Sequence, residues 1–250
     1  MFILFALVFM RMTGAIALNP ILGRSNIPNP VKGAMILVLS FLLYGGTDGV
    51  LTHEPAFMLE FGFMPIKELM VGFAIGFSME LSFAVVRFAA AVLDYIMGLS
   101  MAQTYDPQYN TQMTITSGML YTFLVLLFLA GDGHVRLMAL IYHSARLIPF
   151  GEVMIRPELS TLMVEIFKTS IATGLQLAFP ILAMELVTES AVGILMRIIP
   201  QINVFAVNFQ LKIIVGLMML LYMFSPIASK MYTIIDNLFL YIEEALRLMV

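Results

Sequence analysis

Long apolar runs alternate with short polar breaks along the whole chain. In the first half the apolar runs span residues 1–18, 31–44 and 66–96, and segments rich in Pro and Gly separate them. Apolar runs of this length are typical of helices, whereas strands are shorter. The pattern predicts an all-α fold of long helices and helical hairpins, with a kink where Pro180 interrupts the longest run. The helices expected in the second half span residues 118–130, 135–147, 158–199, 204–224 and 228–250.

One stretch, residues 98–117 (GLSMAQTYDPQYNTQMTITS), is polar although long apolar runs flank it. Thirteen of the eighteen residues from Ser100 to Ser117 carry polar side-chain atoms, and Asp106 is the only charged one. In lipid, the polar groups of such a segment would lack hydrogen-bond partners. Asp106-Pro107 marks a turn, because the residue before proline is disfavoured in the helical conformation. The segment is therefore expected to be a loop facing water, protein or a water-filled path, as the working part of a membrane conduit.

The composition indicates the class of protein. Of the 250 residues, 61% are hydrophobic and 12% are charged, whereas soluble domains are typically about 45–50% apolar and about 25% charged. Such a chain has too little polar surface for a soluble fold, so it is predicted to be an integral membrane protein with one compact helical domain. The net charge of −3 and the lack of a basic run argue against a nucleic-acid partner. Because cysteine is absent, neither disulfides nor thiol chemistry is expected.

Two glycines and three charged residues share one face of the third predicted helix. Gly72 and Gly76 form a GxxxG pair, which lets another helix approach closely. Seven residues advance a helix by nearly two full turns, so Glu80, Arg87 and Asp94 lie on one face, one turn beyond the glycines. Lipid would reject such a charged stripe. This face must therefore meet protein or water; the five residues are predicted to meet other protein through close helix packing and ion pairs, and direct contact with a transported substrate is the alternative.

Other charges inside apolar runs need partners as well. Arg11 lies within the first run, where an unpaired Arg costs at least about 2.5–3.5 kcal/mol, so a salt bridge or helix-end contact inside the bundle is expected. Glu185 and Glu189 are one turn apart, but no His or third carboxylate joins them. They are predicted to make interface hydrogen bonds or ion pairs. Because no basic segment precedes the first run, that run is expected to be a retained helix rather than a cleaved signal.

Three classes of function are compatible with these patterns. A subunit of a protein-conducting or channel assembly fits the polar stretch and the charged stripe. A small-solute transporter fits the broken helices, although no internal repeat is evident. A membrane enzyme is disfavoured, because the chain has no zinc-protease, nucleophile-elbow, phosphate-loop or dinucleotide motif. With the N-terminus outside and residues 118–147 re-entering, seven Lys and Arg residues inside against four outside favour a cytoplasmic C-terminus.

Several segments, taken in order, resemble those of one known family. Each is a weak signal alone, but the ordered set covers almost the whole chain. The chain resembles the FliR family of flagellar type III export-gate subunits, to which a virulence-type secretion subunit is homologous. Members of this family carry several more residues before the first helix. The segments are Arg11 with Asn19-Pro20, residues 26–32 (NIPNPVK), residues 68–76 (ELMVGFAIG), residues 98–102 (GLSMA) with Asp106-Pro107, residues 132–134 (DGH), and residues 200–205 (PQINVF) with Lys212.

The resemblance implies a structural subunit of the flagellar basal body in the bacterial inner membrane, with neither catalytic activity nor cofactors. It implies FliP-like and FliQ-like partner subunits in a helical, ring-like gate, and an FlhB-like subunit on the cytoplasmic side. Unfolded proteins would pass through the centre of this gate. The resemblance also implies two parts: a FliP-like helical part at residues 1–165, and a FliQ-like hairpin with an amphipathic C-terminal helix at residues 166–250.

By the same resemblance, the loop after the third long helix is expected to project into the pore and help to plug it. The plug residues are then Gln103, Tyr105, Asp106, Pro107, Gln108, Tyr109, Asn110, Gln112 and Met113. Together with the charge patterns, the resemblance predicts subunit interfaces at Gly72, Gly76, Glu80, Arg87, Asp94, Glu185, Glu189, Pro200, Gln201, Asn203 and Lys212. No metal site is expected.

Overall fold

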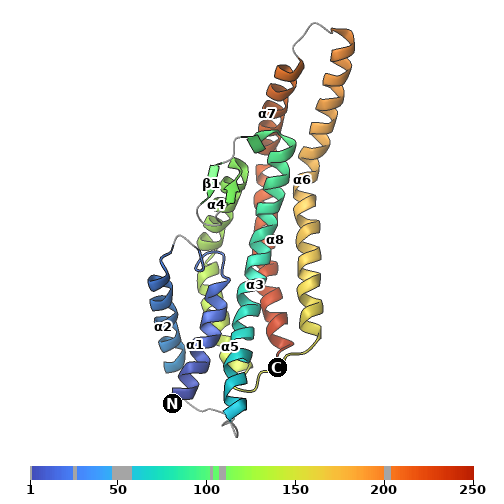
Figure 1. The fold of residues 1–250 in the computed structure, drawn as a ribbon. Helices are drawn as coiled ribbons and strands as arrows, with labels where there is room; N and C mark the ends of the chain where they lie inside the picture. Colours follow the sequence, from blue (N-terminus) through green and yellow to red (C-terminus); the bar gives the residue numbers. More distant parts are fainter. Residues whose placement is uncertain (1, 25–26, 47–57, 102–103, 107–110, 200–203) are drawn as a thin grey trace. The chain divides into compact units, whose positions relative to one another are not determined.

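The computed structural model describes residues 2–24, 27–46, 58–101, 104–106, 111–199 and 204–250, and it confirms the predicted all-α fold (Figure 1). A two-stranded antiparallel ribbon, which the sequence did not predict, interrupts the helices after α3. The helices are α1 (Phe2–Ala17), α2 (Asn29–Gly45), α3 (Met58–Ile96), α4 (Ile115–Ala130), α5 (Gly133–Leu147), α6 (Glu158–Ile198), α7 (Val204–Tyr222) and α8 (Phe224–Arg247). A short 3₁₀ helix, η1 (Leu99–Met101), precedes the strands β1 (Thr104–Asp106) and β2 (Thr111–Met113).

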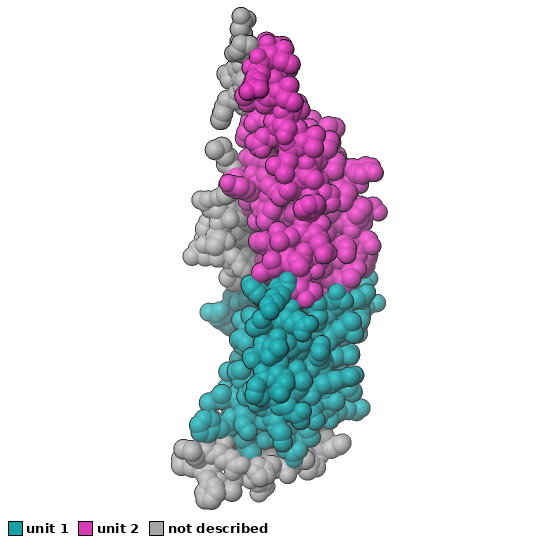
Figure 2. Space-filling model, turned by 90° about the vertical axis from the view of Figure 1, so that its right-hand side faces the viewer, with its two compact units in different colours: residues 1–83, 128–168, 235–250 teal, residues 84–127, 169–234 magenta. Residues whose placement is uncertain are grey.

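The chain forms two compact units that are interleaved along the sequence (Figure 2). Unit 1 contains residues 1–83, 128–168 and 235–250, and unit 2 contains residues 84–127 and 169–234. Helices α3, α4, α6 and α8 therefore each contribute to both units. The proposed division at residue 165 concerns the resemblance of each half to a partner subunit, and it stays a prediction.

In unit 1, α1 packs against α2 and, through glycines, against α3. A Cβ atom on Gly72 would clash with the backbone carbonyl of Arg11, and one on Gly14 would lie 2.7 Å from the backbone nitrogen of Phe73. A Cβ on Gly76 would lie 3.1 Å from the carbonyl of Ala15. The predicted close helix approach is thus present, but the approaching helix is α1 of the same chain.

In unit 2, the C-terminal part of α3 packs against α6 and α7. A Cβ on Gly174 of α6 would lie 3.0 Å from the ring of Phe88, and a Cβ on Gly216 of α7 would clash with the side chain of Met97. On α4, Phe123 packs its ring 4.9 Å from that of Phe224, the first residue of α8. Small residues on α6 and α7 therefore let both helices lie close to α3.

Helix α3 starts earlier than the sequence predicted. It begins at Met58 rather than near residue 66 and includes Pro65. Proline removes one intrahelical hydrogen bond, and the sequence prediction treated it as the end of a loop. The apolar residues around it favour the helix, since Met64 is buried in unit 1. Burial thus outweighs the local cost of the proline.

By length and composition, α3 and α6 are each apolar enough to cross a membrane. Two further pairs, α4 with α5 and α7 with α8, meet at bends of 66° and 60°, so the described residues contain up to four candidate spans. The most apolar 18-residue window of α3 is 61% buried, whereas the corresponding window of α6 is only 17% buried. The apolar face of α6, with Phe179 65% exposed and Val187 62% exposed, therefore needs lipid or another subunit to cover it.

Candidate functional site

The polar stretch after α3 folds into a small ribbon instead of an irregular loop. Strands β1 and β2 pair in antiparallel register, with Thr104 opposite Met113, Tyr105 opposite Gln112, and Asp106 opposite Thr111. The ribbon gives backbone groups of these residues the hydrogen-bond partners that lipid could not supply. Of the predicted plug residues, Tyr105, Asp106, Gln112 and Met113 lie in the strands, whereas Gln103, Pro107, Gln108, Tyr109 and Asn110 lie outside the described residues.

Before the ribbon, the chain leaves α3 through a tight turn. Met97 is fully buried, and Gly98 has a φ of 76°, in the left-handed region that favours glycine. A Cβ on Gly98 would lie 3.3 Å from the ring of Phe209 on α7. Both the backbone conformation and the neighbouring ring therefore select glycine at the start of the polar stretch.

Asp94 holds the other end of the stretch, where α4 begins. Its Oδ2 accepts hydrogen bonds from the backbone N–H groups of Thr116 and Ser117, at 3.0 and 3.3 Å, and the residue is fully buried. A carboxylate at this position satisfies two N–H groups that a helix leaves unpaired, and the helix dipole favours its charge. Asp94 therefore ties the N-terminus of α4 to α3 and closes the segment that carries the ribbon. Oδ1 of Asp94 and Oγ1 of Thr114 have no hydrogen-bond partner among the described residues.

The rest of the predicted charged stripe also makes contacts within the chain. The Arg87 guanidinium lies 5.5 Å from the centre of the Tyr121 ring on α4. The backbone carbonyl of Arg87 accepts a 3.5 Å hydrogen bond from the hydroxyl of Ser117. Glu80 is half-buried and has an interaction partner within the chain. Arg87 and Asp94 thus both connect α3 to the start of α4, while a subunit contact for the stripe stays a prediction.

Glu185 and Glu189 on α6 lie close to Lys212 on α7 in unit 2. Lys212 on α7 forms a 3.1 Å salt bridge with Glu189 on α6, and the two side chains are 21% and 56% exposed. Glu185 is 2% exposed, and neither of its carboxyl oxygens has a hydrogen-bond partner among the described residues. Gly216 on α7 leaves room for the Glu185 carboxyl group, since a Cβ at Gly216 would lie 3.1 Å from Oε1 of Glu185. The other predicted interface residues, Pro200, Gln201 and Asn203, lie outside the described part of the chain.

Arg11 forms the predicted salt bridge within the bundle, in unit 1. Its Nε donates to Oε2 of Glu68 at 2.6 Å, and both side chains are fully buried. Its Nη1 and Nη2 donate to the carbonyls of Ser144 and Ile148, each at 3.0 Å, and the guanidinium lies 4.2 Å from the centre of the Phe150 ring. Arg11 therefore links α1 to α3 and to the C-terminal end of α5.

Sequence reasoning missed Glu68 as the partner of Arg11. Glu68 also accepts a 3.0 Å hydrogen bond from the backbone N–H of Gly151 through Oε1, so both of its oxygens are used. The available signal was charge pairing: a buried Arg in one apolar helix requires an acid in another. Glu68 begins the apolar part of α3 opposite α1, whereas the charged stripe that attracted the prediction lies further along the same helix.

The described residues contain no group of three or more His, Cys, Asp or Glu side chains that could hold a metal ion. Arg11 and Glu68 instead pair with each other, Asp94 bonds to backbone N–H groups, and Arg87 lies over an aromatic ring. Their arrangement holds helices and the ribbon in place.

Comparison with known proteins places these features in a family context. The profile of the bacterial export proteins, family 1, matches residues 2–238. The chain is similar to the flagellar biosynthetic protein FliR of Escherichia coli (strain K12), with 26% identity covering 92% of this chain and 88% of that protein. It is 28% identical to FliR of Pectobacterium carotovorum subsp. carotovorum over 92% of this chain and 88% of that protein. It is 27% identical to FliR of Bacillus subtilis (strain 168), with coverage of 97% and 93%.

Proposed function

The chain belongs to the bacterial export proteins, family 1, and we propose that it is a non-catalytic structural subunit that lines and closes a flagellar protein export gate. The observation that supports this proposal is a polar ribbon between two apolar helices, with Gly98 at the turn after α3 and Asp94 bonded to the start of α4. A transported polypeptide needs a path with polar walls, and lipid-facing helices cannot supply one.

The exposed apolar surface supports assembly with other subunits in the membrane. The apolar window of α6 is 17% buried, and α2 leaves Phe41 and Leu42 70% and 65% exposed. Lipid or protein must cover patches of this kind. We propose that FliP-like and FliQ-like subunits cover part of them in a ring-like gate, with an FlhB-like subunit on the cytoplasmic side. The gate would lie in the bacterial inner membrane, with the C-terminus of this chain cytoplasmic.

The ribbon is the proposed plug of the conduit. Apart from Met113 its strand residues are polar, and Asp106 is the only charged one. Unfolded polypeptide can therefore displace it without stripping water from many charges. Asp94 would act as a positioning residue for this plug, because its hydrogen bonds fix the point at which the polar stretch ends and α4 begins.

Co-purification tests the proposed assembly. When a tagged copy of the chain is expressed with the FliP-like and FliQ-like subunits of the same organism, we expect all three to elute together. The chain expressed alone should aggregate, because its exposed apolar surface then lacks a protein cover. A deletion strain should also fail to export flagellar subunits. A chain that is stable alone and binds a small solute would contradict the gate and favour a transporter.

Replacing Asp94 with alanine is expected to loosen the plug. Loss of a hydrogen-bonded cap at a helix N-terminus costs about 0.5–2 kcal/mol, and here the loss destabilises the junction between the ribbon and α4. Chymotrypsin should cut the Asp94→Ala complex faster within residues 104–113, and the complex should leak ions. Asp94→Asn retains an acceptor oxygen, so its cleavage rate and ion leak should lie between those of Asp94→Ala and the wild type.

A matched acidic control separates this effect from a general loss of stability. Glu165 is an exposed carboxylate on α6, so Glu165→Ala should leave both the cleavage rate and the leak unchanged. If Asp94→Ala destabilised the whole complex without accelerating cleavage at the ribbon, the positioning role would be wrong.

A further inference from the structure

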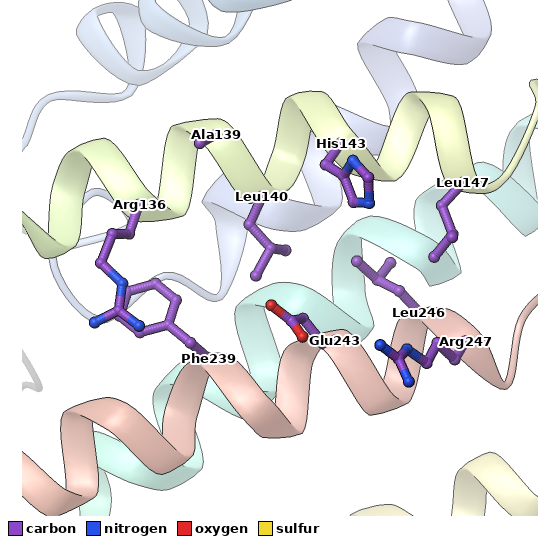
Figure 3. A pocket seen from close by; sticks show the side chains of 9 residues that line it. All are labelled: Arg136, Ala139, Leu140, His143, Leu147, Phe239, Glu243, Leu246 and Arg247. Carbon is purple, nitrogen blue, oxygen red and sulfur yellow. The ribbon is translucent and has the colours of Figure 1, made fainter.

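A groove of about 510 Å³ lies between α5 and the C-terminal end of α8, within unit 1 (Figure 3). Its floor is apolar, and Leu140, Phe239 and Leu246 are 8%, 4% and 1% exposed. Its rim carries Arg136 and His143 from α5, and Glu243 and Arg247 from α8, all exposed to solvent. The volume is within the range of about 300–1,000 Å³ that is usual for small-molecule sites.

Arg136 is held in place at one end of the groove. Its guanidinium lies 4.2 Å from the centre of the Phe239 ring. Its Nη1 donates to Asp236 at 3.1 Å, with side-chain exposures of 50% and 67%. A guanidinium has five N–H donors in a planar fork, so the bond to Asp236 leaves donors for a further anion. Stacking on the ring also reduces the conformational entropy that the side chain would lose on binding.

The other end of the groove carries charges of both signs. Arg247 is the last residue of α8, where the helix dipole favours a cation. Glu243 is one helical turn before it, on the same side. Figure 3 shows His143 and Glu243 directed into the groove from opposite helices. A ligand that fits this end of the groove needs a negative group for Arg247 and a positive group for Glu243.

We propose that this groove binds the headgroup of a phospholipid that carries both a phosphate and a primary ammonium. The phosphate would bind the guanidinium group of Arg247, which matches its geometry, while Arg136 lies at the opposite end of the groove. The ammonium would bind Glu243, and the glycerol and upper acyl carbons would cover the apolar floor. Basic pockets between membrane helices bind lipid headgroups in this way.

The surroundings of the groove favour a lipid over a free phosphate ion. Both α5 and α8 are halves of bent helix pairs that are apolar enough to span a membrane. Leu240 on α8 and Val135 on α5 are 60% and 55% exposed beside the rim. A free phosphate would leave the apolar floor in water, whereas a lipid buries it.

Native mass spectrometry of the assembled complex, with the full chain, tests the proposal. The probes are phosphatidylethanolamine, phosphatidylglycerol and inorganic phosphate, each added to the detergent-solubilised complex at matched concentrations. We expect the complex to retain phosphatidylethanolamine in preference to phosphatidylglycerol and inorganic phosphate. Arg247→Gln should weaken retention of both lipids roughly tenfold, as expected for one charge-assisted hydrogen bond. Glu243→Gln should weaken only phosphatidylethanolamine, so that the preference for it is lost.

Arg146→Gln is the matched control, because Arg146 is an exposed arginine in the last turn of α5 that stacks on Tyr142 and does not line the groove. This variant should change the retention of neither phosphatidylethanolamine nor phosphatidylglycerol. The proposal is overturned if no lipid is retained, if the Arg247 and Arg146 variants behave alike, or if inorganic phosphate displaces the lipid. It is also overturned if Arg247→Gln releases a partner subunit while lipid retention is unchanged, because the groove would then be a protein interface.

Discussion

Replacing Arg11 with alanine is expected to destabilise the folded chain by about 3–5 kcal/mol, the usual cost of breaking a buried ion pair. The substitution leaves the Glu68 carboxylate fully buried without its charge partner. It also removes donors from the carbonyls of Ser144 and Ile148 at the end of α5. Thermal unfolding of the purified complex should therefore shift to lower temperature, and the yield of assembled complex should fall sharply.

Two further variants separate pairing from packing at this site. Arg11→Lys retains the charge, but an ammonium lacks the planar fork with which the guanidinium bonds to Glu68 and to two carbonyls. We therefore expect an intermediate loss of stability. The double variant Arg11→Met with Glu68→Met should be less destabilised than Arg11→Ala, because no unpaired charge remains buried.

Lys230→Ala is the surface control for the Arg11 series, since Lys230 is exposed on α8, and it should change stability by less than about 0.5 kcal/mol. An Arg11→Ala complex with normal yield and unchanged unfolding temperature would show that the buried network does not hold unit 1 together.

The helices could be predicted from the sequence because lipid-facing and core-facing apolar runs leave a strong local signal. Helix α1, predicted at residues 1–18, spans Phe2–Ala17, and α7 starts at the predicted residue. The start of α3 was wrong because Pro65 and the nearby charges look like a loop, whereas the burial that favours the helix arises only in the folded chain. Local pattern therefore determined which elements exist, and tertiary contacts determined where some of them begin.

The partners of the site residues could not be predicted in the same way. The sequence showed that Arg11 needs an acid and that Gly72 admits a helix, but several helices could have supplied each partner. The fold chose Glu68 for Arg11 and α1 for Gly72. Asp94 illustrates the same limit, because its bonds are to backbone N–H groups that carry no sequence signal. The β-ribbon was missed because its two strands are short and polar, without the apolar alternation that indicates a strand.

Deleting residues 105–112 is expected to make the assembled gate leak ions while leaving the rest of the fold intact. The deletion removes most of the proposed plug and joins Thr104 directly to Met113. These two residues are cross-strand partners in the ribbon, where Cα atoms are about 4.5–5.5 Å apart. A peptide bond spans about 3.8 Å, so the new junction needs only a small local adjustment. Gly98 and the Asp94 cap lie outside the deletion and should still hold α3 and α4.

The leak would be measured as conductance of the reconstituted complex in planar bilayers, where we expect a rise of several-fold over the wild type. A second variant replaces residues 105–112 with a Gly-Ser segment of equal length, which retains chain volume but removes the side chains. If side-chain contacts make the seal, both variants leak; if bulk alone makes it, only the deletion does. Unchanged conductance in a normally assembled deletion complex would exclude the ribbon as the plug. The deletion otherwise changes only the new bond between Thr104 and Met113, which are already neighbours in the ribbon.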